Sequence, residues 1–180
     1  MLNFSFTNQI ILLAILLIVS AFFSISETSL MSINRYRLRH LAKNGNTGAK
    51  LATKLLQETD KLLSVILLCN NFSNAAAATL VTVIAVQLYG EQEIIIMMGT
   101  LITTFLILIF SEISPKVIAA AHSERLALSC SFLLFPILKV LYPIVLFVNI
   151  FVLGILKIFN IKINFKQNNL ITMDELKSII

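Results

Sequence analysis

The chain has 180 residues, 58% of them hydrophobic, with a mean hydropathy of +0.92. Soluble domains contain roughly 45–50% apolar residues, so this composition indicates a membrane protein. The net charge of +5 does not predict nucleic-acid binding, because the basic residues lie between apolar segments with little aromatic interleaving. No catalytic triad, phosphate-binding loop or metal–thiolate motif supports an enzyme.

The basic residues are distributed unevenly along the chain. All Lys and Arg residues fall in the blocks 35–61 and 116–177, and none lies in residues 1–34 or 62–115. Basic residues accumulate on the cytoplasmic side of membrane proteins. The distribution therefore predicts an all-α, multi-pass protein of the plasma membrane (the inner membrane in a bacterium). We expect three transmembrane helices, with the N-terminus outside and the C-terminus in the cytoplasm.

The first predicted span covers about residues 4–24 and is long and apolar enough to cross the hydrocarbon core. Residues 36–60 are strongly basic, and Gly45 and Gly48 interrupt them. Leucines on both sides of that interruption predict two short amphipathic helices at the cytoplasmic interface. Their basic residues would face the anionic surface of the lipid bilayer.

The second predicted span, about residues 62–89, contains Asn70, Asn74 and the run Ala75–Ala78. Small residues allow helices to approach closely in lipid, so this face is expected to pack on another helix. A short acidic hairpin at residues 90–93 leads into the third span, about residues 94–115. Pro115 is expected to break or kink its end and to expose backbone carbonyls that can bind ions.

The region 126–156 is apolar enough to span a membrane, but Lys139, Pro136 and Pro143 interrupt it. A crossing would also place the lysines that follow it outside, against the charge rule. We therefore predict bent interfacial or re-entrant helices here. Residues 1–160 form the predicted transmembrane domain. Residues 161–180 form a cytoplasmic linker, with a helix starting near Thr172 and more protein expected to follow.

The candidate ion ligands are polar side chains inside the predicted spans: Ser24, Asn70, Asn74 and Glu112. A helical rise of about 1.5 Å per residue places all of them in the cytoplasmic half of the membrane. Asn70 and Asn74 share one helix face, because they are four residues apart. One carboxylate, two amide oxygens, a hydroxyl and the carbonyls freed by Pro115 would form an all-oxygen set. Such a set suits Mg²⁺ or Ca²⁺ better than zinc or copper.

These residues also have structural explanations. Asn and Ser side chains in membranes often hydrogen-bond between helices. Glu112 can instead lie at the interface and pair with Lys116, four residues further on. Cys69 and Cys130 lack metal-binding spacing and are expected to be two buried thiols, not a disulfide.

Three segments resemble a known family. They are Phe23–Leu30 with Asn34–Leu38, Leu67–Asn74 and Ser111–Lys116. In their order and spacing they resemble the transmembrane domain of the cyclin-M/CorC (CorB/CorC) family, which is associated with transport or efflux of magnesium and, in some members, cobalt. Cys69 and Ser111 depart from the pattern, because a small glycine is expected at both positions.

The resemblance implies a homodimer that holds a dehydrated Mg²⁺ near Ser24, Asn70, Asn74 and Glu112. It also implies that the protein continues, beyond residue 180, into a nucleotide-binding CBS pair that is expected to bind ATP. The function that the resemblance implies is transport or efflux of magnesium, or of cobalt, across the membrane. Two other functions stay open at this point: a Mg²⁺-sensing regulator that transports nothing, and a membrane anchor for the cytoplasmic CBS domain.

Overall fold

The computed structural model describes residues 5–90 and 93–158, and all regular elements in these ranges are helices. The prediction of an all-helical protein is therefore confirmed for this part of the chain. The chain divides into two compact units, Met1–Val145 and Leu146–Ile180. The predicted linker at 161–180 with its helix start, and residues 91–92 of the acidic hairpin, lie outside the described residues.

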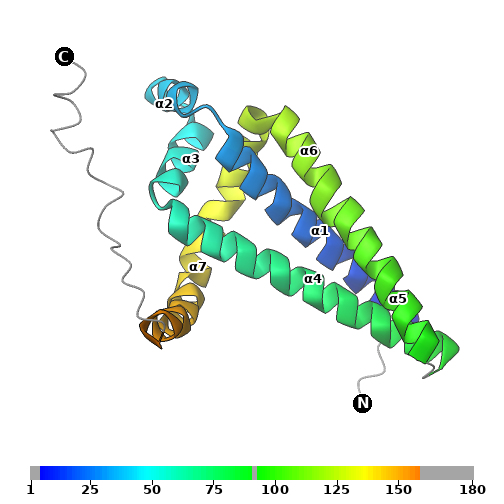
Figure 1. Cartoon of the computed structure of the whole chain (residues 1–180). Helices are drawn as coiled ribbons and strands as arrows, with labels where there is room; N and C mark the ends of the chain where they lie inside the picture. Colours follow the sequence, from blue (N-terminus) through cyan, green and yellow to red (C-terminus); the bar gives the residue numbers. More distant parts are fainter. Residues whose placement is uncertain (1–4, 91–92, 159–180) are drawn as a thin grey trace. The chain divides into compact units, whose positions relative to one another are not determined.

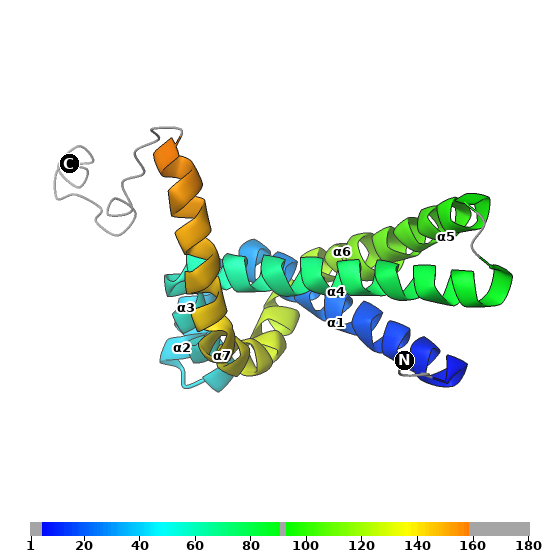
Figure 2. The same cartoon turned by 90° about the horizontal axis from the view of Figure 1, so that it is seen from below.

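Three stretches of helix correspond to the three predicted spans. They are α1 (Phe6–Ser32), α4 (Thr59–Tyr89) and the continuous run of α5 (Glu93–Leu106), η1 (Ile107–Ile113) and α6 (Ser114–Ala121). Each contains more than the roughly 20 residues that cross a bilayer. Within the first unit, α1 packs along α4 and along η1 and α6, while α4 packs on α5 (Figure 1, Figure 2).

The region predicted to form bent interfacial or re-entrant helices is one continuous helix, α7 (Ser123–Ile158), with Pro136 and Pro143 inside it. Its segment Ser123–Ile144 is a fourth stretch that is long and apolar enough to cross a membrane. The prolines do not end the helix, because neighbouring groups in a membrane protein can satisfy the carbonyls that a proline leaves free.

The basic segment folds into two short helices, α2 (Arg35–Lys43) and α3 (Thr47–Gln57). The side chain of Asn34 accepts hydrogen bonds from two backbone N–H groups at the start of α2. The side chain of Asn46 caps α3 by accepting one, from the backbone N–H of Ala49. Gly45 adopts φ +92° in the turn between them. The turn needs glycine here because positive φ is unfavourable for other residues.

Gly48, predicted to interrupt the basic segment together with Gly45, lies inside α3. A Cβ atom at this position would lie 2.9 Å from the backbone oxygen of Leu128 and 3.2 Å from the ring of Phe132. Gly48 therefore lets α3 approach α7 closely, and it does not interrupt the helix.

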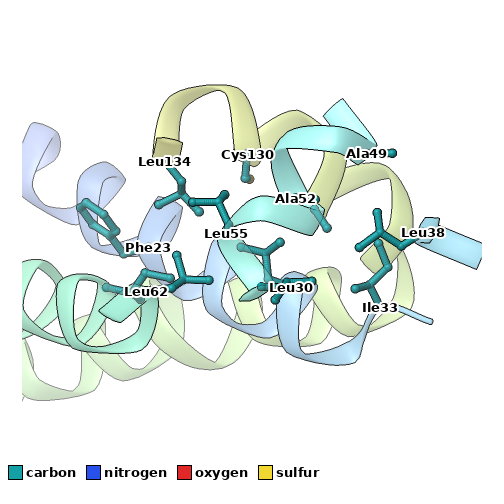
Figure 3. Packing of buried hydrophobic residues seen from close by; sticks show 13 residues of the cluster. Phe23, Leu30, Ile33, Leu38, Ala49, Ala52, Leu55, Leu62, Cys130 and Leu134 are labelled. Carbon is teal, nitrogen blue, oxygen red and sulfur yellow. The ribbon is translucent and has the colours of Figure 1, made fainter. Parts of the chain in front are cut away.

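The hydrophobic core lies where α1 ends and α4 begins, and α2, α3 and α7 contribute to it (Figure 3). Its most deeply buried large side chains include Leu30, Leu62, Ile66 and Leu134. Large apolar side chains elsewhere on α1 and α5, such as Ile18 and Phe105, are exposed, as expected for surfaces that face lipid. The two short helices are therefore anchored to the ends of the long ones.

The third apolar stretch is not broken at Pro115. It contains a seven-residue π-helix, η1, and Pro115 lies in the first turn of α6, with Ser114 in helical geometry. A proline is tolerated in the first turn of a helix because its missing N–H is not needed there. The local distortion is therefore a widening of the helix ahead of Pro115, and π-helical turns of this kind often occur at functional sites.

Candidate metal centre

Four polar side chains from α1, α4 and η1 form a connected group, which we call the polar cluster: Ser20, Asn70, Asn74 and Glu112. The hydroxyl oxygen of Ser20 lies 2.6 Å from Oδ1 of Asn70 and 2.7 Å from Oδ1 of Asn74. Nδ2 of Asn74 donates to Oε1 of Glu112 across 3.3 Å. Three of the four predicted ligands are thus brought together by hydrogen bonds.

The positions of the cluster residues along their helices bring their side chains together. Asn70 and Asn74 lie one turn apart on α4 and so face α1 together. Glu112 belongs to the π-helix η1. The neighbouring Ser111 is fully buried, and its hydroxyl lies 3.4 Å from the backbone oxygen of Leu17 on α1. This contact ties η1 to α1 beside the cluster.

The polar cluster contains more acceptor oxygens than protons to share among them. Asn74 uses its amide N–H to bind Glu112, so its oxygen faces Ser20. The Ser20 hydroxyl has one proton and can donate to only one of the two Asn oxygens at a time. Three oxygen atoms therefore converge with a single proton between them.

Ser24, the fourth predicted ligand, is not part of this hydrogen-bond network. It lies one turn after Ser20 on α1 and is fully buried. Its hydroxyl oxygen has no hydrogen-bond partner among the described residues. A buried hydroxyl without a partner costs about 1–3 kcal/mol, so this position would gain from a ligand.

Ser20 was missed in the sequence. The available signal was its spacing of four residues from Ser24, which puts both hydroxyls on one face of the first span. A lone serine inside an apolar span is weak by itself, because membrane serines often bond only to their own helix.

The pairing of Glu112 with Lys116, considered as an alternative, is not the one found. Nζ of Lys116 lies 3.7 Å from Oε2 of Glu27, which links α6 to α1. Glu112 instead faces the amide of Asn74. The bonds between Ser20 and the two asparagines are also what a purely structural role predicts, so Glu112 is the residue that distinguishes an ion site from helix packing.

The described ranges hold no group of three or more His, Cys, Asp and Glu side chains that could bind a metal. Cys69 and Cys130 are both free thiols, and only Cys130 is buried, since Cys69 is partly exposed. Any cation held by the polar cluster would therefore meet one carboxylate and several neutral oxygens. Mg²⁺ is commonly held this way, because it binds through one or two carboxylates and retains several waters.

Comparisons with known proteins place the chain in a family. Residues 11–180 match the cyclin M transmembrane N-terminal domain. The chain is 46% identical over 170 residues to a UPF0053 protein of Haemophilus influenzae, covering 94% of this chain and 40% of the relative. It is 40% identical over 162 residues to the UPF0053 inner membrane protein YfjD of Escherichia coli, covering 90% and 37%.

A more distant relative is a DUF21 domain-containing chloroplastic protein of Arabidopsis thaliana, At1g55930, with 31% identity over 173 residues. The match covers 96% of this chain and 26% of that relative. The chain thus spans at most about two fifths of the length of these curated relatives. The family match extends over nearly the whole sequence, including all three motifs, and the chain belongs to the cyclin-M (CorC-type) transmembrane-domain family.

Proposed function

We propose that this chain is the membrane domain of a magnesium transporter and that the polar cluster holds the transported ion. The observation that carries the proposal is the hydrogen bond from Nδ2 of Asn74 to Oε1 of Glu112. It joins one carboxylate from η1 to the asparagine whose oxygen, like that of Asn70, faces Ser20. Carboxylates inside membrane segments are costly and usually mark ion pathways.

The chemistry of the polar cluster supports Mg²⁺ as the cargo. A hard cation prefers oxygen ligands, and the converging oxygens of Ser20, Asn70 and Asn74 have too few protons to satisfy one another. An ion placed among them would supply the missing positive charge. The unpartnered hydroxyl of Ser24, one turn away, would offer a further oxygen.

The cluster also has the form that alternating access requires. Its ligands come from three helical elements, so a small movement of α1 relative to α4 and η1 would separate Ser20 from the asparagines. Such movement of packed helices around a site in the membrane is the usual mechanism of secondary transporters. We propose that Mg²⁺ is bound and released in this way, without covalent chemistry.

For topology we propose three crossings, with α7 at the cytoplasmic interface. The basic residues of α2 and α3 and those after residue 156 then lie on the same side. The test uses Gly45→Cys and Asn160→Cys in a chain whose Cys69 and Cys130 are replaced by alanine. An impermeant thiol reagent should label both from the same side, and labelling from opposite sides would show that α7 crosses.

We also propose a homodimer, followed in the whole protein by a CBS pair. Ala77 is buried within the chain, while Phe72, Ala75 and Thr79 form an exposed face of α4 on which a second copy could pack. Cysteine cross-linking at Ala75 in native membranes should give a covalent dimer. Absence of cross-links along this face would place the dimer contact elsewhere or remove it.

The decisive experiment is Mg²⁺ flux into proteoliposomes that contain the purified full-length protein, with Glu112→Gln as the matched variant. We expect flux from the wild type and little from the variant. Mg²⁺ binding without flux would identify a sensor or regulator. If the wild type neither binds nor transports Mg²⁺, the role of a membrane anchor remains.

A further inference from the structure

A polar pocket lies between α2 and α3, away from the polar cluster. Its volume is about 110 Å³, and it is lined by Arg35, Leu38, Arg39, Thr53, Leu56 and Gln57. We call it the arginine pocket. None of these lining residues belongs to the polar cluster.

The spacing of the lining residues explains how the pocket forms. Arg35 and Arg39 are one turn apart on α2, and Thr53 and Gln57 are one turn apart on α3, so each helix offers one face. Leu38 and Leu56 are buried and form the apolar floor. The arginines and Gln57 are exposed and form a rim rich in N–H donors.

Among the residues that the structure describes, no carboxylate lines the pocket. Glu58, which follows Gln57 in the chain, and Glu124 on α7 have other partners within the described ranges. Glu58 pairs with Lys61 at 3.1 Å, and Glu124 pairs at 2.5 Å with Arg37, which lies between the two pocket arginines on α2. Two positive charges thus share one small recess without an acidic residue in its lining.

The position of the pocket in the chain places it at the membrane surface. α2 directly follows the long apolar helix α1, and α3 directly precedes α4. Tyr36, next to Arg35, is 84% exposed. Exposed tyrosines beside the ends of apolar helices are typical of the headgroup layer, where the ring contacts lipid and the hydroxyl contacts water.

We propose that the arginine pocket binds the phosphate group of an anionic membrane lipid. Arginine presents its N–H groups as a fork that matches phosphate oxygens, and two such forks with the Gln57 amide can surround one phosphate. The pocket is much smaller than the roughly 300–1,000 Å³ of sites that enclose a whole small molecule. It therefore takes a single headgroup whose acyl chains remain in the bilayer.

The test measures thermal unfolding of the purified full-length protein in a mild detergent. Three additives are compared: dioleoylphosphatidylglycerol, dioleoylglycerol, which lacks the phosphate, and inorganic phosphate. The variant is Arg35→Gln with Arg39→Gln. The control is Lys43→Gln with Lys50→Gln, which removes the same charge from exposed positions of the same basic segment outside the pocket.

We expect phosphatidylglycerol, and not dioleoylglycerol, to stabilise the wild type and the lysine control. In the arginine variant its apparent affinity should fall about tenfold or more, the scale of losing one charged hydrogen bond. Equal stabilisation by inorganic phosphate would support the pocket but assign it to free phosphate. Equal lipid responses in all three proteins, or no response in the wild type, would overturn the proposal. All pocket arginines and control lysines are exposed, so equal unfolding midpoints without additive verify that each variant folds.

Discussion

The hydrophobic core and the polar cluster are held together by different forces, although α1 belongs to both. In the core, large side chains such as Leu30, Leu62 and Leu134 are almost completely buried. In the polar cluster, the helices meet through small and polar groups that form few hydrogen bonds. Core packing resists displacement, while a few hydrogen bonds can be exchanged for ligand bonds at little cost.

The core and the polar cluster therefore have different roles. The core fixes the end of α1 to α2, α3, α4 and α7 and so determines stability. The polar cluster determines what is bound. Substitutions in the core should therefore change stability far more than Mg²⁺ affinity. Substitutions in the polar cluster should act mainly on Mg²⁺ affinity, with at most small changes in stability.

The largest effect is expected for Glu112→Gln. The variant keeps the shape and can still accept the hydrogen bond of Asn74, but it loses the charge. Two unit charges at 4 Å interact by about 4 kcal/mol at an effective dielectric of 20, and a divalent ion gains more. Mg²⁺ affinity should fall about 100-fold or more.

Isothermal titration, or Mg²⁺-dependent thermal stabilisation, measures this loss. The unfolding midpoint without Mg²⁺ should match that of the wild type. Wild-type Mg²⁺ affinity in Glu112→Gln would reject the metal centre and favour the anchor role.

The second prediction concerns the core. In Gly48→Ala the new Cβ would lie 2.9 Å from the backbone oxygen of Leu128, which cannot move as easily as a side chain. The free energy of unfolding should fall by about 1–3 kcal/mol, with Mg²⁺ affinity unchanged. Gly99→Ala is the matched control, because its Cβ would be 3.5 Å from that of Ala85, an ordinary contact.

Thermal unfolding in detergent compares these two variants. Gly99→Ala should be neutral or stabilising, since alanine favours a helix over glycine by about 0.5–1 kcal/mol. Equal midpoints for the two variants would mean that α3 does not depend on close contact with α7.

The sequence predicted the long helices and three of the four polar residues at the site for clear reasons. Charge-free apolar runs identify membrane helices, and Asn70, Asn74 and Glu112 were placed at similar depth by counting helical rise. The motif resemblance identified the family. These signals are local, or depend only on position along a helix.

What the sequence missed depends on three-dimensional detail. Ser20 matters only because α1 crosses α4 beside Asn70 and Asn74. The π-helix η1 is a change in backbone hydrogen bonding that no residue pattern predicts. Pro115 instead indicates a break in the helix at this point. Gly48 was read as a turn residue because glycine signals both turns and close helix contacts.

A smaller loss of Mg²⁺ affinity is expected for the asparagines. Asn74→Ala removes one oxygen and the hydrogen bond that positions Glu112, while Asn70→Ala removes one oxygen only. Affinity should fall about tenfold for Asn74→Ala and less for Asn70→Ala, the scale of one neutral hydrogen bond or slightly more. Asn71→Ala, at an exposed neighbouring position, is the control and should bind like the wild type.

Titration of all three asparagine variants tests the order. A larger loss from Asn71→Ala than from Asn74→Ala would contradict the face of α4 assigned to the site.

The smallest effects are expected for the serines, and their signs separate the two roles. Ser24→Ala removes a buried hydroxyl that has no partner among the described residues, so the protein without Mg²⁺ should be as stable as the wild type or more stable. Ser20→Ala removes the donor that faces Asn70 and Asn74, so the same protein should be less stable by about 1 kcal/mol. If Ser24 is a ligand, its variant should also gain less stability on adding Mg²⁺, because it lacks one oxygen that a water can only partly replace. Unfolding midpoints measured with and without Mg²⁺ give the sign of the stability change in each variant and the size of its response to Mg²⁺. If Ser24→Ala responds to Mg²⁺ like the wild type, Ser24 is not a ligand, and the polar cluster remains the site without it.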